Sequence, residues 1–150
     1  MTSEAAELAA LSGLEQLRAI FAGSTAYEGL VKTLQLQPVS AERGLIVFEG
    51  SPTPAVYNPL GSVHGGYAAA LLDTVMGCAV HSCLEPDQAY TTLEIKVAYH
   101  RALSEASGPD RAEGKIVSIG RRAAFAEGKL FDKDGHLAAT GTTTCLVFNR

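Results

Sequence analysis

The sequence predicts an α+β domain in which an antiparallel sheet of about six strands wraps around one long central helix, with a further helix near the N-terminus. The central helix is expected over residues 64–84, because the stretch from Gly65 to Leu84 is rich in Ala and Leu and has one charged residue, Asp73. Such a helix should be buried on most sides. Segments that alternate between apolar and polar residues flank it and predict strands. Short turns join these segments and favour antiparallel pairing.

The part of the chain before the central helix predicts one helix, two strands and a loop. Over residues 4–22, apolar residues recur at spacings of three and four, which predicts a single amphipathic helix. These residues are Leu8, Leu11, Leu14, Leu17 and Phe21. Alternation over residues 30–37 and 44–49 predicts two strands, with residues 41–44 as the turn between them. Residues 51–62 contain three prolines and predict a loop.

The part after the central helix predicts four strands. In the first, residues 91–99, strict alternation places Thr92 on the face opposite to the larger apolar residues. Those residues are Leu93, Ile95, Val97 and Tyr99. Strands are expected on both sides of a turn at residues 120–122, and Asp-Lys-Asp-Gly at residues 132–135 predicts a hairpin. The last strand, residues 137–148, is rich in Thr and Val.

Length and charge limit the class of protein. The chain has 150 residues, of which 47% are hydrophobic and 19% charged, as expected for one globular domain. We expect residues 1–26 to form an N-terminal helical extension and residues 27–150 the main domain. The net charge of −4 and the pI near 5.5 argue against a general nucleic-acid binder, because binding phosphates requires a surplus of Lys and Arg. A local basic cluster remains compatible with one phosphorylated small molecule.

Location and cysteine content can also be predicted. The first ten residues contain two Glu and no Lys or Arg, and no stretch reaches the roughly 18 apolar residues of a membrane span. We therefore expect a cytoplasmic protein without a membrane partner. Cys78, Cys83 and Cys145 form neither an even set nor a Cys-x-x-Cys pair, so we expect buried thiols rather than disulfides or a zinc site. No His-x-x-x-His cluster indicates another metal.

The central helix combines a carboxylate with a pair of glycines. An ionised Asp73 among apolar neighbours is costly unless it is partnered or borders a pocket, and a purely structural hydrogen bond explains it equally well in isolation. Upstream, Gly65 and Gly66 follow His64 at the start of the helix. The N–H groups of this first turn have no intrahelical partners and lie at the positive end of the helix dipole. They suit a carbonyl oxygen that gains negative charge, so the two features together indicate hydrolysis of an acyl group.

Gly65 and Asp73 lie too far apart along one helix to act on the same atom. At roughly 1.5 Å per residue, they are about 12 Å apart along the axis. The two parts meet only if a second copy of the helix runs antiparallel beside the first. The sequence therefore predicts an active site shared between the subunits of a symmetric dimer.

Four segments match one family in order and spacing. They are Asn58 with His64-Gly65-Gly66 and Asp73, residues 92–99 (Thr-Leu-Glu-Ile-Lys-Val-Ala-Tyr), residues 118–122 (Ser-Ile-Gly-Arg-Arg) and residues 134–138 (Asp-Gly-His-Leu-Ala). Over about residues 27–148 the chain resembles the PaaI-like hotdog-fold acyl-CoA thioesterases. The resemblance implies homodimers with active sites at the subunit interface, and homotetramers built from two such dimers. It also implies an acyl- or aroyl-CoA substrate and no cofactor, since coenzyme A is part of the substrate.

The resemblance further implies roles for individual residues. Asp73 is the general base that activates water, or the nucleophile that attacks the thioester. The Gly65 N–H polarises the carbonyl, Asn58 and His64 of the partner subunit orient the substrate or support that turn, and Thr92 positions the water. The remaining residues contact the substrate, with the two Arg residues suited to the phosphates of coenzyme A. They are Gly66, Ser118, Gly120, Arg121 and Arg122.

Some positions depart from the family or allow a simpler explanation. Some members have Glu in place of Asp73, and some have Thr where this chain has Gly77, which gives Thr92 more weight as the water-positioning residue. His64 is equally consistent with a helix cap, and the two Arg residues with a solvated pair in a turn. His81 is expected to be buried or interfacial, and the other histidines solvated. The candidates for lining the acyl pocket are Tyr67, Met76 and the N-terminal helix.

Two other functions compete with hydrolysis. A hotdog-fold hydratase of enoyl thioesters is expected to pair a catalytic His with an acid in a different motif. A non-catalytic acyl-CoA-binding sensor usually adds a DNA-binding segment, whereas the N-terminal helix here is short and acidic. A serine nucleophile is disfavoured because neither Ser62 nor Ser118 lies in a Gly-x-Ser-x-Gly setting.

Overall fold

A computed structural model of the chain describes residues 3–23 and 29–150. Six strands, four α-helices and two short 3-10 helices follow one another in these residues. In chain order they are α1 (Ser3–Ala9), α2 (Gly13–Phe21), α3 (Leu30–Thr33), β1 (Gln37–Glu42), β2 (Leu45–Gly50), η1 (Pro54–Val56), α4 (Gly65–His81), β3 (Gln88–Tyr99), η2 (Glu105–Ser107), β4 (Asp110–Ile119), β5 (Ala123–Phe131) and β6 (Leu137–Asn149).

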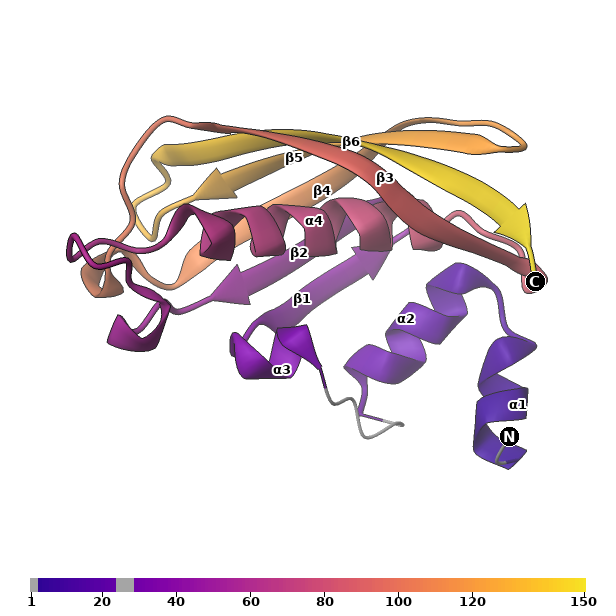
Figure 1. The fold of residues 1–150 in the computed structure, drawn as a ribbon. Helices are drawn as coiled ribbons and strands as arrows, with labels where there is room; N and C mark the ends of the chain where they lie inside the picture. Colours follow the sequence, from indigo (N-terminus) through magenta and orange to yellow (C-terminus); the bar gives the residue numbers. More distant parts are fainter. Residues whose placement is uncertain (1–2, 24–28) are drawn as a thin grey trace.

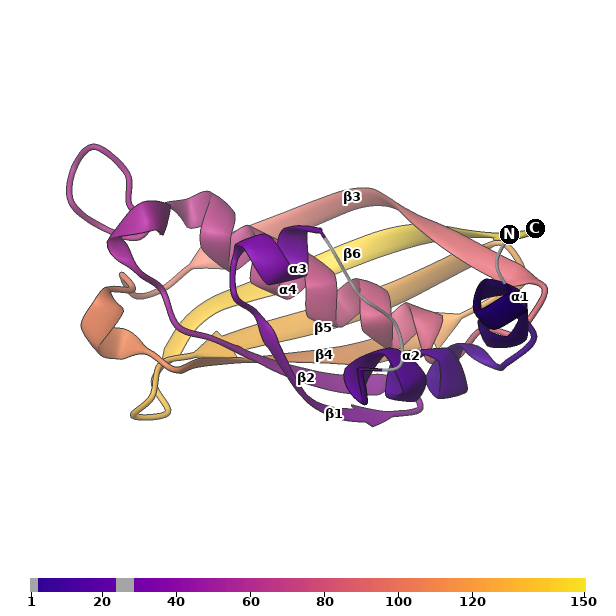
Figure 2. The same cartoon turned by 90° about the horizontal axis from the view of Figure 1, so that it is seen from below.

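The strands form one antiparallel sheet that curves around α4 (Figure 1). The strand order is β1-β2-β4-β5-β6-β3, so β1 and β3 are the two edges. Side chains of α4 such as Leu71, Leu72, Val75 and Met76 are fully buried against the sheet. Figure 2 shows α2 and α3 on the face of α4 that the sheet leaves open. The predicted hotdog architecture, a long helix wrapped by six antiparallel strands, is confirmed.

A row of glycines brings the sheet close to α4. Gly114, Gly128 and Gly141 lie directly opposite one another in β4, β5 and β6. A side chain at Gly114 would overlap the backbone carbonyl of Val75, and a methyl group at either of the other two would lie 3.0 or 3.1 Å from the nearest side-chain atom of α4. The absence of side chains in this row therefore lets the sheet contact the helix backbone.

The N-terminal part differs from the single helix expected over residues 4–22. It forms two helices, because Ser12 starts a new one: its hydroxyl accepts the Glu15 N–H at 3.4 Å, and the Glu15 carboxylate accepts the Ser12 N–H at 2.9 Å. This reciprocal capping box satisfies two otherwise unpaired donors at the start of α2. The stripe of apolar residues continues across the break, so the apolar spacing alone cannot reveal where one helix ends and the next begins.

The strand expected over residues 30–37 is also wrong. Residues 30–33 form the short helix α3, and β1 begins only at Gln37. Leu30 and Leu34 are spaced for one face of a helix as well as for alternation, and Gln35 has a φ of 55°, which ends the helix and redirects the chain. Leu36 then enters the core with 2% of its surface exposed.

The central helix is shorter than the expected 64–84. It ends at His81, where Ser82 caps it through its N–H to the Cys78 carbonyl at 2.9 Å. The Ser82 hydroxyl accepts the Gly44 N–H at 2.7 Å, so it also joins the helix end to the β1–β2 turn. None of the helices in the described residues has the length and apolar content that crossing a membrane requires.

The glycine row can be tested at Gly114. We expect Gly114→Ala to lower the free energy of unfolding by about 1–3 kcal/mol, because the added methyl group must displace backbone of α4. Gly120→Ala is the matched control, since a Cβ there meets its nearest neighbour at 3.5 Å, an ordinary contact. Urea unfolding followed by circular dichroism measures both variants. Equal stabilities for the two would contradict a close approach at Gly114.

Candidate active site

Asp73 lies in the middle of α4, half-buried, and is held by Thr92 on β3. The Thr92 hydroxyl donates a hydrogen bond to Asp73 Oδ1 at 3.3 Å. The other carboxylate oxygen remains available to a second donor or a proton. The single chain thus brings together the carboxylate and the hydroxyl residue that were expected to act together.

Thr92 reaches α4 because β3 contains a bulge. The register with β6 shifts between Thr92 and Glu94, and an extra residue reverses the faces of the strand beyond it. Strict alternation predicts that Thr92 and Tyr99 point to different faces of β3. In the structure both side chains bond to α4: Thr92 to Asp73, and Tyr99 to the Gly65 carbonyl at 2.8 Å. The predicted separation of Thr92 from Tyr99 is therefore wrong.

Asp73 borders a cavity of about 640 Å³ between α4 and the N-terminal helices. The cavity is lined by residues of α2, α3, α4 and strands β1 to β3, among them Asp73, Cys78 and His81. Its size is typical of small-molecule pockets. The N-terminal helix was one of the expected lining elements and does line it. Tyr67 and Met76 instead lie in the core, each at most 3% exposed.

The start of α4 is organised by His64. This residue is the N-cap, and its Nδ1 accepts the Gly66 N–H at 2.8 Å. The capping explanation for His64 is therefore confirmed. Within the described residues, the neighbouring Gly65 N–H donates to no protein group, so it is the donor of this turn that an external carbonyl oxygen can use.

Asn58 shapes the loop that leads into this turn. Its Oδ1 accepts the N–H groups of Leu60 and Ser62 at 2.9 and 3.3 Å, and its Nδ2 donates to the Ser62 hydroxyl at 3.0 Å. Downstream, the His64 N–H donates to the Val56 carbonyl at 2.8 Å. Asn58 therefore acts on the turn through the loop, as a supporting residue.

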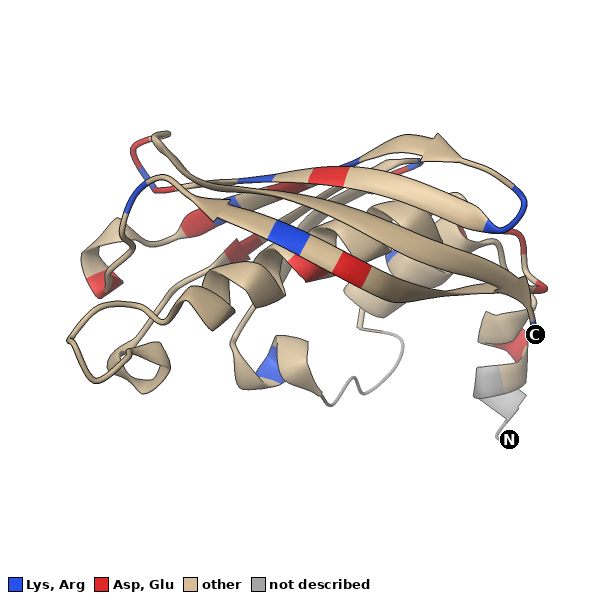
Figure 3. Cartoon of the chain, turned by 45° about the horizontal axis from the view of Figure 1, so that its top comes forward, with Lys and Arg blue, Asp and Glu red and all other residues tan. Residues whose placement is uncertain are grey.

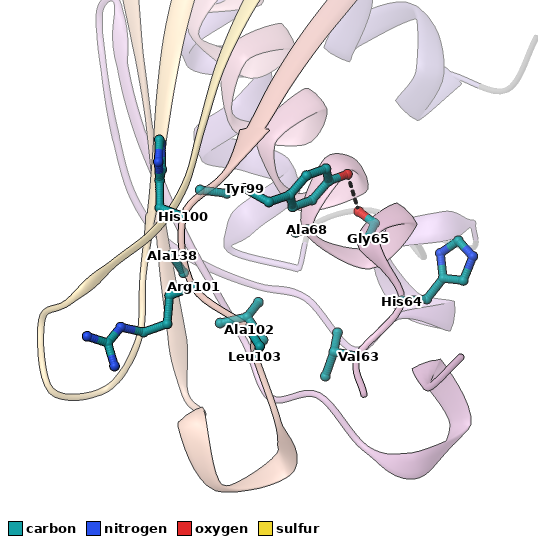
Figure 4. A pocket seen from close by; sticks show the side chains of 11 residues that line it. Val63, His64, Gly65, Ala68, Tyr99, His100, Arg101, Ala102, Leu103 and Ala138 are labelled. Carbon is teal, nitrogen blue, oxygen red and sulfur yellow. Dashed lines mark hydrogen bonds between the residues drawn. The ribbon is translucent and has the colours of Figure 1, made fainter. Parts of the chain in front are cut away.

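A second cavity, of about 390 Å³, borders the Gly65 turn (Figure 4). Tyr99, His100 and Arg101 at the end of β3 contribute to its lining. Sequence reasoning did not identify this group, and its one signal was the position of Tyr99 at the end of the alternating strand. The contact matters because the Tyr99 hydroxyl holds the Gly65 carbonyl and so fixes the plane of the peptide that follows.

In one chain the two parts of the site stay apart. Gly65 and Asp73 lie eight residues apart on α4, about 12 Å along the axis. Each borders its own cavity, and neither cavity contains both residues. Within the described residues, one chain therefore has an unpaired N–H donor at one cavity and a positioned carboxylate at the other.

The expected substrate contacts on the β4–β5 hairpin lie away from both cavities. Ser118, Gly120, Arg121 and Arg122 are exposed, and none of them lines either cavity. The Gly120 N–H donates to the Ala123 carbonyl at 2.8 Å, which closes the turn. In Figure 3 the basic residues are interspersed with acidic ones along the described strands and turns.

The thiol and imidazole beside the Asp73 cavity are held neutral. Burial, with a contribution from the negative charge of Asp73, raises the pKa of the Cys78 thiol to about 12, so it is not a thiolate nucleophile. Burial lowers the pKa of His81, and its Nε2 pairs with Gln16 Oε1 at 3.1 Å. All three cysteines are free; Cys83 and Cys145 are buried as expected, whereas Cys78 is only partly buried because it borders the cavity. His81 is, as expected, a partnered residue between packed elements.

A buried carboxyl group lies beneath the first turn of α4. Asp110 is fully buried, and its Oδ1 accepts the Ser107 hydroxyl at 2.9 Å. Burial raises its pKa to about 6. Among the described residues, Asp110 Oδ2 and the Tyr67 hydroxyl are buried polar atoms without a hydrogen-bond partner.

One group of side chains outside both cavities has donor atoms within reach of a single ion. Asp132, Asp134 and His136 on the β5–β6 turn place their ligand atoms within 4.8 Å of one another. The Asp132 carboxylate accepts the N–H groups of Asp134 and His136 at 3.0 and 2.9 Å, and the His136 contact is the main cause of its lowered pKa. These hydrogen bonds stabilise the hairpin turn, and this explains why the three side chains lie close together.

Comparison with known proteins matches this chain to thioesterases and a CoA-thioester hydrolase. The family model of the thioesterase superfamily matches residues 60–139. A 1,4-dihydroxy-2-naphthoyl-CoA hydrolase from Listeria monocytogenes is 30% identical over 119 residues, which cover 79% of this chain and 95% of that protein. A proofreading thioesterase, EntH, from Klebsiella pneumoniae is 30% identical over 99 residues, 66% of this chain and 71% of that protein.

Solved structures share the fold. A conserved protein from Pseudomonas aeruginosa has a TM-score of 0.74 at 30% identity, covering 81% of this chain and 95% of that one. The PaaI protein from the phenylacetic acid degradation operon of E. coli has a TM-score of 0.77 at 16% identity, covering 92% and 94%. The second similarity concerns the fold alone.

The capping role of His64 is testable by stability. We expect His64→Ala to lower the free energy of unfolding by about 1 kcal/mol, because the Gly66 N–H loses its acceptor. His64→Asn keeps a side-chain acceptor of the preferred type and should stay close to the unmodified protein. Urea unfolding measures both. If Asn and Ala destabilise equally, the imidazole contributes more than a cap.

Proposed function

This chain belongs to the thioesterase superfamily and has the hotdog fold, and on that basis we propose that it is a PaaI-like enzyme that hydrolyses acyl-CoA thioesters to a free acid and coenzyme A. The observation that carries the proposal is the half-buried Asp73 carboxylate, held by Thr92 at the edge of a cavity of about 640 Å³. The name of the Listeria relative, a hydrolase of an aroyl-CoA, supports a coenzyme A thioester as substrate.

The reaction uses one donor and one carboxylate. The thioester carbonyl oxygen accepts the Gly65 N–H at the positive end of α4, where negative charge is stabilised as it develops. Asp73 takes the proton from a water molecule whose oxygen adds to the carbonyl carbon. The tetrahedral intermediate collapses, the carbon–sulfur bond breaks, and the sulfur leaves as the thiol after receiving the proton. Direct attack by Asp73 would use the same carboxylate as a nucleophile.

The two groups come from different subunits in this proposal. Strand β3 is an edge of the sheet and exposes Leu93, Ile95 and Tyr99 at 62%, 37% and 56%. An edge strand with apolar side chains is a template for pairing with a second copy. Antiparallel pairing of two β3 strands across a two-fold axis would place the two α4 helices antiparallel, with Gly65 of one near Asp73 of the other. Asn58 and His64 would support the donor turn.

Coenzyme A would extend from the shared site across the protein surface. Arg121 and Arg122 on the exposed β4–β5 hairpin suit bidentate binding of its phosphates. Ser118, Gly120 and Gly66 would supply hydroxyl and backbone contacts beside them. Such a role requires the dimer, because the hairpin borders neither cavity of the single chain.

Removing the Gly65 donor tests the oxyanion role. Gly65 is the first residue of α4, where proline is tolerated, and His64 has the extended conformation that precedes proline (φ −63°, ψ 135°). We expect Gly65→Pro to lower kcat about 100-fold or more, since one oxyanion donor is lost. Free-thiol release from a panel of acyl- and aroyl-CoAs measures it.

Gly65→Ala is the matched control for the Gly65→Pro variant. It adds the same Cβ, 3.0 Å from the Tyr99 hydroxyl, and keeps the N–H. We expect it to keep kcat within about tenfold of the unmodified protein, because the donor remains. Equal activity of the Pro and Ala variants would contradict a role for the Gly65 N–H. Tight binding without thiol release by the unmodified protein would indicate a sensor, and hydration of an enoyl-CoA a hydratase.

Mixed oligomers test the shared site. Asp73→Asn and Gly65→Pro are each expected to be inactive alone. Co-expressed in equal amounts, they should recover about a quarter of normal activity, because half of the dimers are mixed and each contains one intact site of two. A mixture of Asp73→Asn with Asp73→Ala, the control, should stay inactive. If the first mixture also stays inactive, the two groups act within one chain or not at all.

A further inference from the structure

The Asp73 cavity is walled by the N-terminal helices. Leu17, Ile20 and Phe21 of α2 and Leu30 and Val31 of α3 face it from the side opposite to α4. Helices α2 and α3 lie outside the curved sheet (Figure 2). The space next to the candidate carboxylate is therefore bounded by the N-terminal helices as well as by α4 and the sheet.

Helix α2 is attached at both ends, so this wall is fixed. At its start, the Gly13 N–H donates to the Leu84 carbonyl at 3.0 Å, and Gln16 Oε1 pairs with His81 Nε2 at 3.1 Å. At its end, Phe21 packs edge-on against Phe48 of β2, with ring centroids 5.3 Å apart at 88°. Contacts at both ends hold the side chains between them at a set distance from α4.

The lining chemistry favours an acyl group without charge or hydroxyl groups. Among the described residues that line the cavity, Asp73 carries the one formal charge, and it would repel a second carboxylate. Two polar side chains of the lining have protein partners: the Thr74 hydroxyl donates to the Ala70 carbonyl at 2.7 Å, and His81 pairs with Gln16. Most of the remaining lining consists of Leu, Ile, Val, Phe and Pro side chains, together with Gln37, Cys78 and Tyr90.

The lining of the cavity extends along α4. The α4 residues that line it begin at Asp73 and continue to His81, which spans about 12 Å along the helix axis. An extended chain advances about 1.2 Å per bond, so this length accommodates about ten carbons. A flat aromatic acid would fill only part of it.

We infer that the cavity is the acyl pocket of this protein, that it takes unbranched, uncharged aliphatic acyl groups of about eight to ten carbons, and that Ile20 on α2 forms part of the wall that confines them. The inference rests on the proposed function in one respect: Asp73 marks the end of the pocket where the thioester carbonyl lies. The acyl chain then runs from Asp73 along α4 toward His81, with Ile20 against its side.

The substrate class is tested with a series of straight-chain acyl-CoAs from acetyl to palmitoyl, together with benzoyl-CoA and succinyl-CoA. We expect kcat/KM to rise to a maximum near decanoyl-CoA and to fall beyond it. Benzoyl-CoA and succinyl-CoA should be at least about tenfold poorer, because they leave the pocket unfilled or bring a charge into it. A maximum at benzoyl-CoA, succinyl-CoA or acetyl-CoA overturns the assignment.

The wall residue is tested with Ile20→Trp. The larger side chain should lower kcat/KM for decanoyl-CoA about tenfold or more and move the maximum to shorter chains, with butanoyl-CoA unaffected. Leu14→Trp is the matched control: Leu14 is also half-buried on α2 but does not line the cavity. An unchanged maximum in Ile20→Trp, or an equal shift in both variants, overturns the role of Ile20.

Binding measurements test the pocket assignment independently of the proposed hydrolysis. Alkyl-CoA thioethers of graded length cannot be hydrolysed, and calorimetry gives their Kd. If Kd is lowest near ten carbons and Ile20→Trp shifts that minimum, the pocket assignment holds even if no thioester is cleaved, and only hydrolysis fails. If thioesters are cleaved but neither Kd nor kcat/KM depends on chain length, hydrolysis holds and the pocket assignment fails.

Discussion

The close packing of the sheet on α4 determines the rest of the molecule. Gly114, Gly128 and Gly141 form a row across three strands, and through it the sheet contacts the helix backbone near Val75. This contact sets the rotation of α4 about its own axis: the face with Val75 points into the sheet. The residues on the opposite face, including Asp73, then have no place except the space beneath α2 and α3, where the cavity lies.

Helix α4 also holds two functional groups, an N–H donor and a carboxylate, at a fixed distance from each other. Its first turn, capped by His64, offers the Gly65 N–H, and its middle offers the Asp73 carboxylate. A helix cannot shorten the distance between them, so a reaction that needs both requires two helices. A dimer with a two-fold axis would form two such sites, because antiparallel copies of the helix pair each donor with the carboxylate of the other chain. The proposed site is thus a consequence of helix geometry as much as of residue type.

In the proposed mechanism, the reacting groups and the residues that select the acyl group lie on different elements. The groups proposed to react come from α4 and β3, whereas Ile20 and its neighbours on α2 bound the space for the acyl group. Helix α2 is held by a few local contacts, among them the Gln16–His81 pair. A change in its apolar side chains alters the shape of the cavity without displacing the carboxylate, since the rotation of α4 depends on the sheet.

The amino-acid sequence by itself determined the central helix, five of the six strands, the hairpin at residues 132–135 and the presence of a glycine turn and one carboxylate on the same helix, because these depend on local periodicity and turn chemistry. Only the tertiary structure decided that Thr92 faces Asp73, since a bulge reverses the faces of a strand without a trace in its alternation. The break at Ser12 and the helix at residues 30–33 likewise depend on a reciprocal cap and on a single residue with positive φ, where two local patterns compete. The cavity beneath α4 exists only because segments far apart in sequence pack there, and periodicity within one segment contains no information about that contact.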